Sequence, residues 1–155
     1  MKGYEQQARV DFNETFASVV KPMSYKALFA IAAVRDLEIE QMDVKTTSIY
    51  GSVKEEIYVD QPEGFDDGTG RVCRLNKALY GLKQSPRVWY QTLSDFLKNT
   101  GFKPLNSDSS VFAKGSMYIT VYVDNLLLLS PTGVIMIVSA WAKTTNLKID
   151  DYPEI

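Results

Sequence analysis

Two aspartates stand where the surrounding sequence makes a carboxylate costly to bury. Asp43 follows a methionine and precedes a valine, and Asp124 lies in a run of valines and leucines. A partly desolvated carboxylate needs a cation or hydrogen-bond donors to stay charged. If the strands that carry them belong to one sheet, the two carboxylates can share a pair of divalent cations, the arrangement used for phosphoryl transfer. Such oxygen ligands favour Mg²⁺.

Each aspartate also has an interpretation without chemistry. Asp124 and Asn125 form a favourable pair for a tight hairpin turn, and Asp43 can equally be a solvated aspartate at the end of a strand. Spacing alone leaves both interpretations open.

The composition excludes several other kinds of site. The 155 residues, 45% of them apolar and 23% charged, predict one globular domain. The chain has no histidine, which excludes imidazole metal sites, Ser-His or Cys-His triads and histidine general bases. A net charge of −2 excludes a broadly cationic surface, so any site for a polyanion must be local.

The single cysteine, Cys73, and the lack of a signal-peptide pattern predict a reducing, intracellular location in the cytoplasm, with the nucleus as an alternative. The apolar stretch 126–142 is interrupted at 130–133. It therefore predicts a strand, a turn and a helix in the core rather than a membrane span.

The local patterns predict the elements that must position the two aspartates. We expect a helix over 24–36 with Ser24 as its N-cap, a strand over 37–42 that delivers Asp43, and short strands at 57–59 and 72–75. A second amphipathic helix should run from Ser85 to Gly101. Antiparallel strands at 117–123 and 126–129 should be joined by a turn at Asp124–Asn125, followed by a helix over 134–147.

A basic segment lies between residues 68 and 94, which contain five bases and no acid. Interleaved with Tyr80, Trp89 and Tyr90, it could follow a phosphate backbone and stack on bases. A solvated basic face with the aromatic rings in the core is the alternative. Residues 54–67, with six acids and one lysine, are interpreted as a solvated edge.

Five motifs in this order resemble the copia-type LTR-retrotransposon reverse transcriptases. They are DFNETFA at 11–17, QMDVKT at 41–46, EEIYVDQPEGF at 55–65, the segment 75–89 that contains YGLKQSPR, and YVDN at 122–125. The likeness extends from about Lys2 to Ile149.

The resemblance implies an α+β fold: the fingers-and-palm portion of a right-hand polymerase, with an antiparallel sheet backed by helices. Residues 1–155 would be one domain, with partial fingers at 1–36 and mainly palm at 37–149. It would be truncated at both ends, and the family's primer-gripping strands, thumb and RNase H domain would have no counterpart.

The resemblance also implies an RNA-directed DNA polymerase site for template-primer and deoxynucleotides. Asp43 and Asp124 would be the catalytic aspartates, and with the Val44 carbonyl they would bind two Mg²⁺ ions, or Mn²⁺. The implied nucleotide contacts are Val44, Ser48, Tyr80, Gly81, Lys83 and Gln84. The nucleic-acid contacts expected from the basic segment are Arg71, Arg74, Lys77 and Arg87.

Two residues depart from the family pattern. Asn125 replaces the second aspartate of the hairpin and removes a negative charge beside the metals, which should weaken catalysis. Ser48 replaces a bulky aromatic residue that excludes the ribose 2′-hydroxyl. Together with the missing thumb, these changes predict weak or no turnover in the isolated chain.

Two further expectations follow. The apolar run 134–138 predicts a surface for a protein partner or for self-association, or else burial under neighbouring residues. The alternative to an enzyme is a degenerate or repurposed transposon fragment that binds nucleic acid or protein without catalysis.

Overall fold

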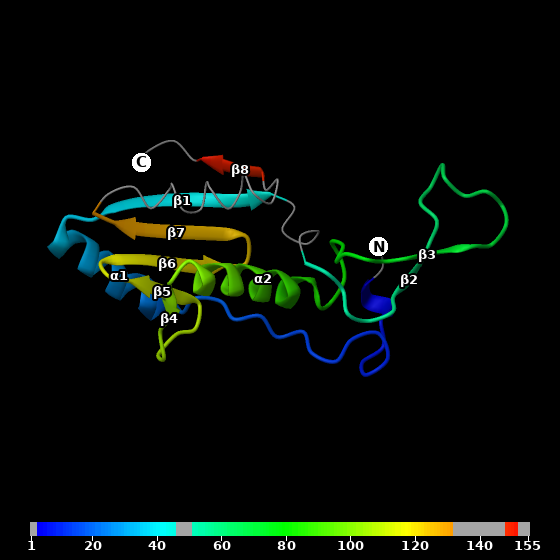
Figure 1. Cartoon of the computed structure of the whole chain (residues 1–155), viewed down its shortest axis with the longest axis horizontal. Helices are drawn as coiled ribbons and strands as arrows, with labels where there is room; N and C mark the ends of the chain where they lie inside the picture. Colours follow the sequence, from blue (N-terminus) through cyan, green and yellow to red (C-terminus); the bar gives the residue numbers. More distant parts are fainter. Residues whose placement is uncertain (1–2, 46–50, 132–147, 152–155) are drawn as a thin grey trace.

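The computed structural model describes residues 3–45, 51–131 and 148–151. Its main body is a six-stranded antiparallel sheet with one helix on each face, and a two-stranded ribbon projects away from it (Figure 1). The predicted α+β architecture with an antiparallel sheet and helices is confirmed.

The sheet has the strand order β4-β5-β6-β7-β1-β8. The central pair is β1 (Glu38–Lys45) and β7 (Asn125–Ser130), which places Asp43 opposite Asn125. On one side follow β6 (Met117–Tyr122), β5 (Val111–Lys114) and β4 (Lys103–Pro104), and on the other side lies β8 (Lys148–Asp151). Both strands that carry the candidate aspartates are therefore neighbours in the middle of the sheet.

The face of the sheet that carries the main core packs against α2 (Ser85–Asn99). This helix presents Trp89, Leu93 and Leu97 to the sheet at helical spacing, as the sequence predicted. Alternate residues of the strands pack against these side chains. They are Met42, Val44, Phe112, Ile119, Val121, Leu126 and Leu128. We call this the α2 face.

The opposite face, here the α1 face, is covered in part by α1 (Pro22–Arg35). The helix begins at Pro22, two residues before the expected N-cap Ser24, and proline suits the first helical position because its missing N–H needs no partner there. Asp108 accepts hydrogen bonds from the Lys21 backbone N–H (2.8 Å), the Ser24 hydroxyl (2.6 Å) and the Ser110 backbone N–H (3.1 Å). Asp108 therefore fastens the start of α1 from a distant loop, although the N-cap residue Lys21 makes no side-chain capping hydrogen bond.

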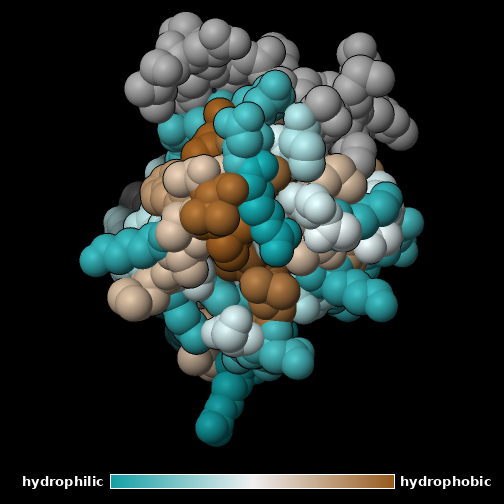
Figure 2. All heavy atoms as spheres, turned by 90° about the vertical axis from the view of Figure 1, so that its left-hand side faces the viewer, coloured by the Kyte–Doolittle hydropathy of each residue, from teal (hydrophilic) through white to brown (hydrophobic). Residues whose placement is uncertain are grey.

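The ribbon consists of β2 (Tyr58–Asp60) and β3 (Val72–Arg74), and a short 3-10 helix, η1 (Gly3–Glu5), lies near it in Figure 1. At the other end of the molecule, apolar side chains form a band between polar margins (Figure 2). The last turn of α1 and the start of β1 lie at that end and carry exposed Val34 and Ile39.

Some expectations need correction, and others concern residues that the structure does not describe. The β6–β7 turn consists of Val123 and Asp124, one residue earlier than predicted, since Tyr122 pairs with Asn125. The short strands β4, β5 and β8 were not predicted. Ser48, the helix expected at 134–147 and its apolar run 134–138 lie outside the described residues. In the described part of the chain, no helix is long and apolar enough to span a membrane.

Candidate active site

The β6–β7 turn is held in an unfavourable backbone conformation. Val123 has a φ of 57°, a region that β-branched residues rarely adopt. Positive φ at the first residue of a two-residue turn is the signature of a type II′ turn, which normally has glycine there. A residue in this conformation costs of order 1–3 kcal/mol and persists only when its surroundings impose it.

The turn brings Asp124 beside Asp43. The backbone N–H of Val44 donates to the Asp124 carbonyl at 2.9 Å, which continues the β1–β7 pairing beyond the Asp43–Asn125 position. Both aspartates are half-buried. On the other side of β1, Asp150 takes the register position opposite Asp43. The structure thus places Asp43, Val44 and Asp124 next to one another at one end of the sheet.

Asn125 connects Asp124 to β1 through its side-chain amide. Its Nδ2 donates to Oδ1 of Asp124 at 3.3 Å, and its Oδ1 accepts from Nε2 of Gln41 at 3.3 Å. A charged aspartate at position 125 could still accept from Gln41, but it would have no donor for Asp124 and would repel that carboxylate. The residue that departs from the family pattern therefore stabilises the turn in the absence of a cation.

Trp89 contacts the turn from the α2 face. Its indole Nε1 donates to the Val123 carbonyl at 2.6 Å, and the ring is only 2% exposed. The core interpretation of Trp89 is therefore confirmed, and base stacking by this ring is excluded in this conformation. Tyr90 is half-buried, packs against the same cluster and donates its hydroxyl to the Ser109 carbonyl at 2.8 Å.

The loop before α2 carries the expected nucleotide contacts in two different environments. Tyr80 is 89% exposed, and Gly81 has a φ of 97° that favours glycine. Gln84, in contrast, is 2% exposed. Its side chain accepts from the Gln6 amide at 3.1 Å and donates to the Asp11 carbonyl at 3.1 Å.

Lys83 and Arg87 also hold the N-terminal segment. Lys83 donates its backbone N–H to the Gln6 side chain at 2.8 Å, and its ammonium lies 5.0 Å from the centre of the Phe12 ring. Arg87 pairs with Glu14 at 2.6 Å. In this structure these side chains fasten residues 6–16 to the start of α2, and their contact with substrate stays a prediction.

The remaining bases of the basic segment lie on or near the ribbon. Arg74 pairs with Glu56 at 3.1 Å, Arg71 pairs with Asp67, and Lys77 is exposed. Hydrogen bonds from the Thr69 hydroxyl and from Arg71 lower the pKa of Asp67 to about 2. Arg71 is therefore partly neutralised within its own turn, and a contact of these residues with nucleic acid is likewise still a prediction.

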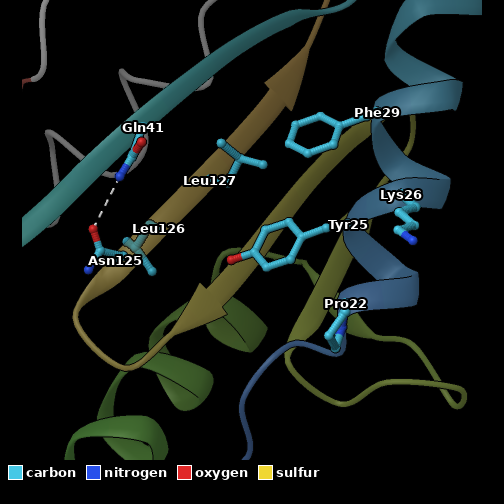
Figure 3. A pocket seen from close by; sticks show the side chains of 8 residues that line it. All are labelled: Pro22, Tyr25, Lys26, Phe29, Gln41, Asn125, Leu126 and Leu127. Carbon is cyan, nitrogen blue, oxygen red and sulfur yellow. Dashed lines mark hydrogen bonds between the residues drawn. The ribbon is translucent and has the colours of Figure 1, made fainter.

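A hollow of about 450 Å³ opens on the α1 face beside the turn. Figure 3 shows its walls, formed by Tyr25 and Phe29 of α1 on one side and by Gln41, Asn125 and Leu127 of the sheet on the other. The two rings are stacked with centroids 6.2 Å apart. Gln41 and Asn125, which are neighbours of Asp43 and Asp124 in the chain, thus line a hollow on the face that α1 covers incompletely.

The donor set can be compared with what a divalent cation requires. Two carboxylates and neighbouring backbone and amide oxygens suit Mg²⁺ or Mn²⁺, which take hard oxygen ligands and keep several waters. Within residues 3–45, 51–131 and 148–151, no group of three or more His, Cys, Asp or Glu residues is arranged to hold a metal. The residues fit such an ion in kind, but with one carboxylate fewer than a three-carboxylate site.

Sequence reasoning missed the contacts that shape this site. Nothing in the spacing of Trp89 indicates that its indole reaches a turn 34 positions away, and the pairing of Gln41 with Asn125 depends on strand register. The only sequence signal for the contact between α2 and the turn was a tryptophan in the first turns of the predicted helix. A tryptophan at that position equally indicates a core residue.

Comparisons with known proteins identify the family of the chain. A family profile described as reverse transcriptase (RNA-dependent DNA polymerase) matches residues 1–151. The retrovirus-related Pol polyprotein from transposon TNT 1-94 of Nicotiana tabacum is 43% identical over 135 residues, which cover 83% of this chain and 10% of that protein.

Two further relatives cover similar parts of the chain. The retrovirus-related Pol polyprotein from transposon RE1 of Arabidopsis thaliana is 41% identical over 133 residues, 82% of this chain and 9% of that protein. The transposon Ty1-BL Gag-Pol polyprotein of Saccharomyces cerevisiae is 35% identical over 104 residues, 65% of this chain and 6% of that protein. The chain thus spans a tenth or less of the length of these relatives.

Proposed function

The chain belongs to the copia-type reverse transcriptase (RNA-dependent DNA polymerase) family, and on that premise we propose that it forms the palm and part of the fingers of such a polymerase. Residues 37–149 would be mainly palm, and residues 1–36 partial fingers. The reaction would be addition of deoxynucleotides to a primer annealed to an RNA or DNA template.

One observation carries the proposal. Asp43 and Asp124 lie far apart in the sequence, yet Val44 N–H and the Asp124 carbonyl are 2.9 Å apart and both aspartates are half-buried at one end of the sheet. The backbones that carry the two carboxylates are thus adjacent, and two anions close to each other favour a divalent cation between them. A role as solvated turn and strand-end residues would not require this proximity.

The chain's own groups have distinct tasks in this proposal. Asp43 and Asp124, with the Val44 carbonyl, would hold two Mg²⁺ or Mn²⁺ ions. Bound there, the ions would activate the primer 3′-hydroxyl and stabilise charge on the reacting phosphate. Exposed Tyr80 and Gly81 would face the incoming nucleotide, where glycine allows close approach of the backbone.

Lys83 and Gln84 would act in part by fixing the position of that loop. Their hydrogen bonds to Gln6 and Asp11 tie the loop before α2 to the N-terminal segment. Nucleic acid would meet the basic segment through Arg71, Arg74, Lys77 and Arg87, and their contacts with phosphate would make binding sensitive to salt.

Primer extension tests the proposal. The purified chain should extend an annealed primer, though weakly because of Asn125 and Ser48, with Mg²⁺ or Mn²⁺ and not with EDTA, and Asp43→Asn should remove the product. Glu38→Gln, which neutralises an exposed carboxylate at the other end of the same strand, should leave extension unchanged. Absence of product with both metals would contradict the proposal.

A non-catalytic fragment that binds nucleic acid is the second candidate. Asn125 favours this candidate, because its amide donates a hydrogen bond to the Asp124 carboxylate without a cation. A neutral residue at this position also leaves the site with less negative charge. Salt-sensitive binding of a template-primer by a chain that makes no product would support this candidate.

A further inference from the structure

The indole of Trp89 reaches the one peptide group of the hairpin turn that can change orientation. Its Nε1 donates to the Val123 carbonyl at 2.6 Å. In a two-residue turn between paired strands, types I′ and II′ differ mainly by rotation of the central peptide. Here that peptide joins Val123 to Asp124, and its carbonyl is the group that Trp89 holds.

Fixing this carbonyl also fixes the backbone of Asp124. A peptide group is planar, so the direction of the Val123 carbonyl sets the direction of the Asp124 N–Cα bond. That bond leads to the Cα atom that bears the Asp124 side chain. The next peptide is held as well, since the Asp124 carbonyl accepts from Val44 N–H at 2.9 Å. Asp124 is thus fastened on both sides, once to the core helix and once to the strand that carries Asp43.

The donor itself is immobile. Trp89 is 2% exposed and packs within the cluster that includes Met42, Val44, Leu93 and Leu126. A rigid donor is needed because Val123 has positive φ, a conformation that a β-branched residue leaves when its surroundings permit.

We propose that Trp89 is a positioning residue that aims the Asp124 carboxylate at the shared metal ions through the Val123 carbonyl. The assignment rests on the proposed function, because it concerns the same pair of aspartates. Trp89 touches neither metal nor substrate and acts only through the turn.

Trp89→Phe removes the donor and keeps an aromatic ring in the core. The matched control is Tyr90→Phe on the next residue of α2, which removes a hydrogen bond of the same kind to the Ser109 carbonyl (2.8 Å). We expect Trp89→Phe to weaken Mg²⁺ binding, measured by titration calorimetry, by about 10- to 100-fold. It should also move the Asp124 backbone amide resonance in NMR spectra, whereas Tyr90→Phe should do neither.

A second measurement uses the wild-type chain and avoids any change to the core. Titration with Mg²⁺ should shift the Trp89 indole N–H resonance together with the Asp124 amide resonance, and Asp124→Asn should abolish both shifts. Mg²⁺ binding by Trp89→Phe equal to the wild type, or an indole resonance that stays in place while the Asp124 amide moves, would overturn the assignment.

The two proposals fail in different ways. A wild-type chain that binds no Mg²⁺ contradicts the proposed function. The role of Trp89 in the turn is then decided by the Asp124 amide resonance in the metal-free chain. That resonance moves in Trp89→Phe if the indole holds the turn and stays in place if it does not.

Discussion

The two faces of the sheet differ, because one forms the main core and the other carries the candidate site. Along β1 and β7, Met42, Val44, Leu126 and Leu128 point to the α2 face, and each is 1% exposed. The alternating residues point to the α1 face and are exposed or half-buried, and they are Gln41, Asp43, Asn125 and Leu127. Gln41, Asn125 and Leu127 line the hollow on that face. The strand pair β1–β7 thus contributes both to the core and to the candidate active site, because successive side chains of a strand point to opposite faces.

The buried α2 face stabilises the conformation of residues that border the α1 face. The strained turn beside Asp124 is fixed by Trp89, which belongs to the α2-face cluster. The α1 face is secured at a different place, where Asp108 fastens the start of α1. We therefore expect substitutions on the two faces to separate stability from function.

The largest effect on stability should come from the α2 face. Leu128→Ala removes a fully buried side chain and should lower the free energy of unfolding by about 2–5 kcal/mol. Leu127→Ala, the same change one residue away on the half-buried α1 face, should cost less than half as much because less apolar area is lost. Urea denaturation measures both, and equal losses would break the distinction between the faces.

The next largest effect should come from Asp108, which anchors the α1 face. Burial acts to raise the pKa of this carboxyl, but it is outweighed by three hydrogen bonds, from Lys21 N–H, the Ser24 hydroxyl and Ser110 N–H, and by the charge of Lys21. The pKa is therefore held below its ordinary value. Asp108→Asn should cost about 1–3 kcal/mol at pH 7 because it leaves donors without a charged acceptor.

This lowered pKa also predicts how stability depends on pH. The native state holds the proton of Asp108 less tightly than the unfolded state, so its stabilisation is complete above the unfolded pKa of about 3.9. It is lost as the pH falls through the lower native pKa. Urea titrations between pH 7 and 2 should show this loss in the wild type and not in Asp108→Asn, whereas the exposed control Asp95→Asn should behave like the wild type.

A smaller effect, opposite in sign for stability and function, is expected at Asn125. Asn125→Asp removes the amide donor to Asp124 and adds a like charge, so the metal-free chain should lose roughly 0.5–1.5 kcal/mol. The added carboxylate should tighten Mn²⁺ binding and increase primer extension, because it adds an oxygen ligand and a negative charge. A variant that is less stable without any gain in Mn²⁺ affinity would contradict the role assigned to this end of the sheet.

The smallest change in stability should occur at Tyr80. Its ring is 89% exposed, so Tyr80→Ala should alter the free energy of unfolding by less than about 0.5 kcal/mol. If the ring meets nucleotide or nucleic acid as proposed, binding of a template-primer with nucleotide should weaken several-fold in a fluorescence anisotropy titration. Unchanged binding would remove Tyr80 from the site.

The sequence predicted the elements whose signals are local. The stripe of Trp89, Leu93 and Leu97 after Ser85 and Pro86 specified α2, and the two apolar runs around Asp124 specified the hairpin. The motif order indicated the family, which the comparisons confirm.

The sequence failed where a distant residue overrides a local preference. Asp124–Asn125 has better turn chemistry than Val123–Asp124, but the register that pairs Val121 with Leu126 and the indole of Trp89 impose the earlier turn. Likewise Ser24 is a residue type that favours the N-cap, yet it lies inside α1 and donates its hydroxyl to Asp108 of a distant segment. The burial of Gln84 could not be predicted either, because it depends on a contact with the distant residue Gln6.

The central claim is that Asp43 and Asp124 act as one metal site, and a double-mutant cycle of Mn²⁺ binding tests it most directly. Titration calorimetry would compare the wild type, Asp43→Asn, Asp124→Asn and the double variant. If the carboxylates share ions, either single change should weaken Mn²⁺ binding about as much as both together, because the losses of coupled ligands do not add. Wild-type affinity in either single variant, or losses that simply add, would contradict the account.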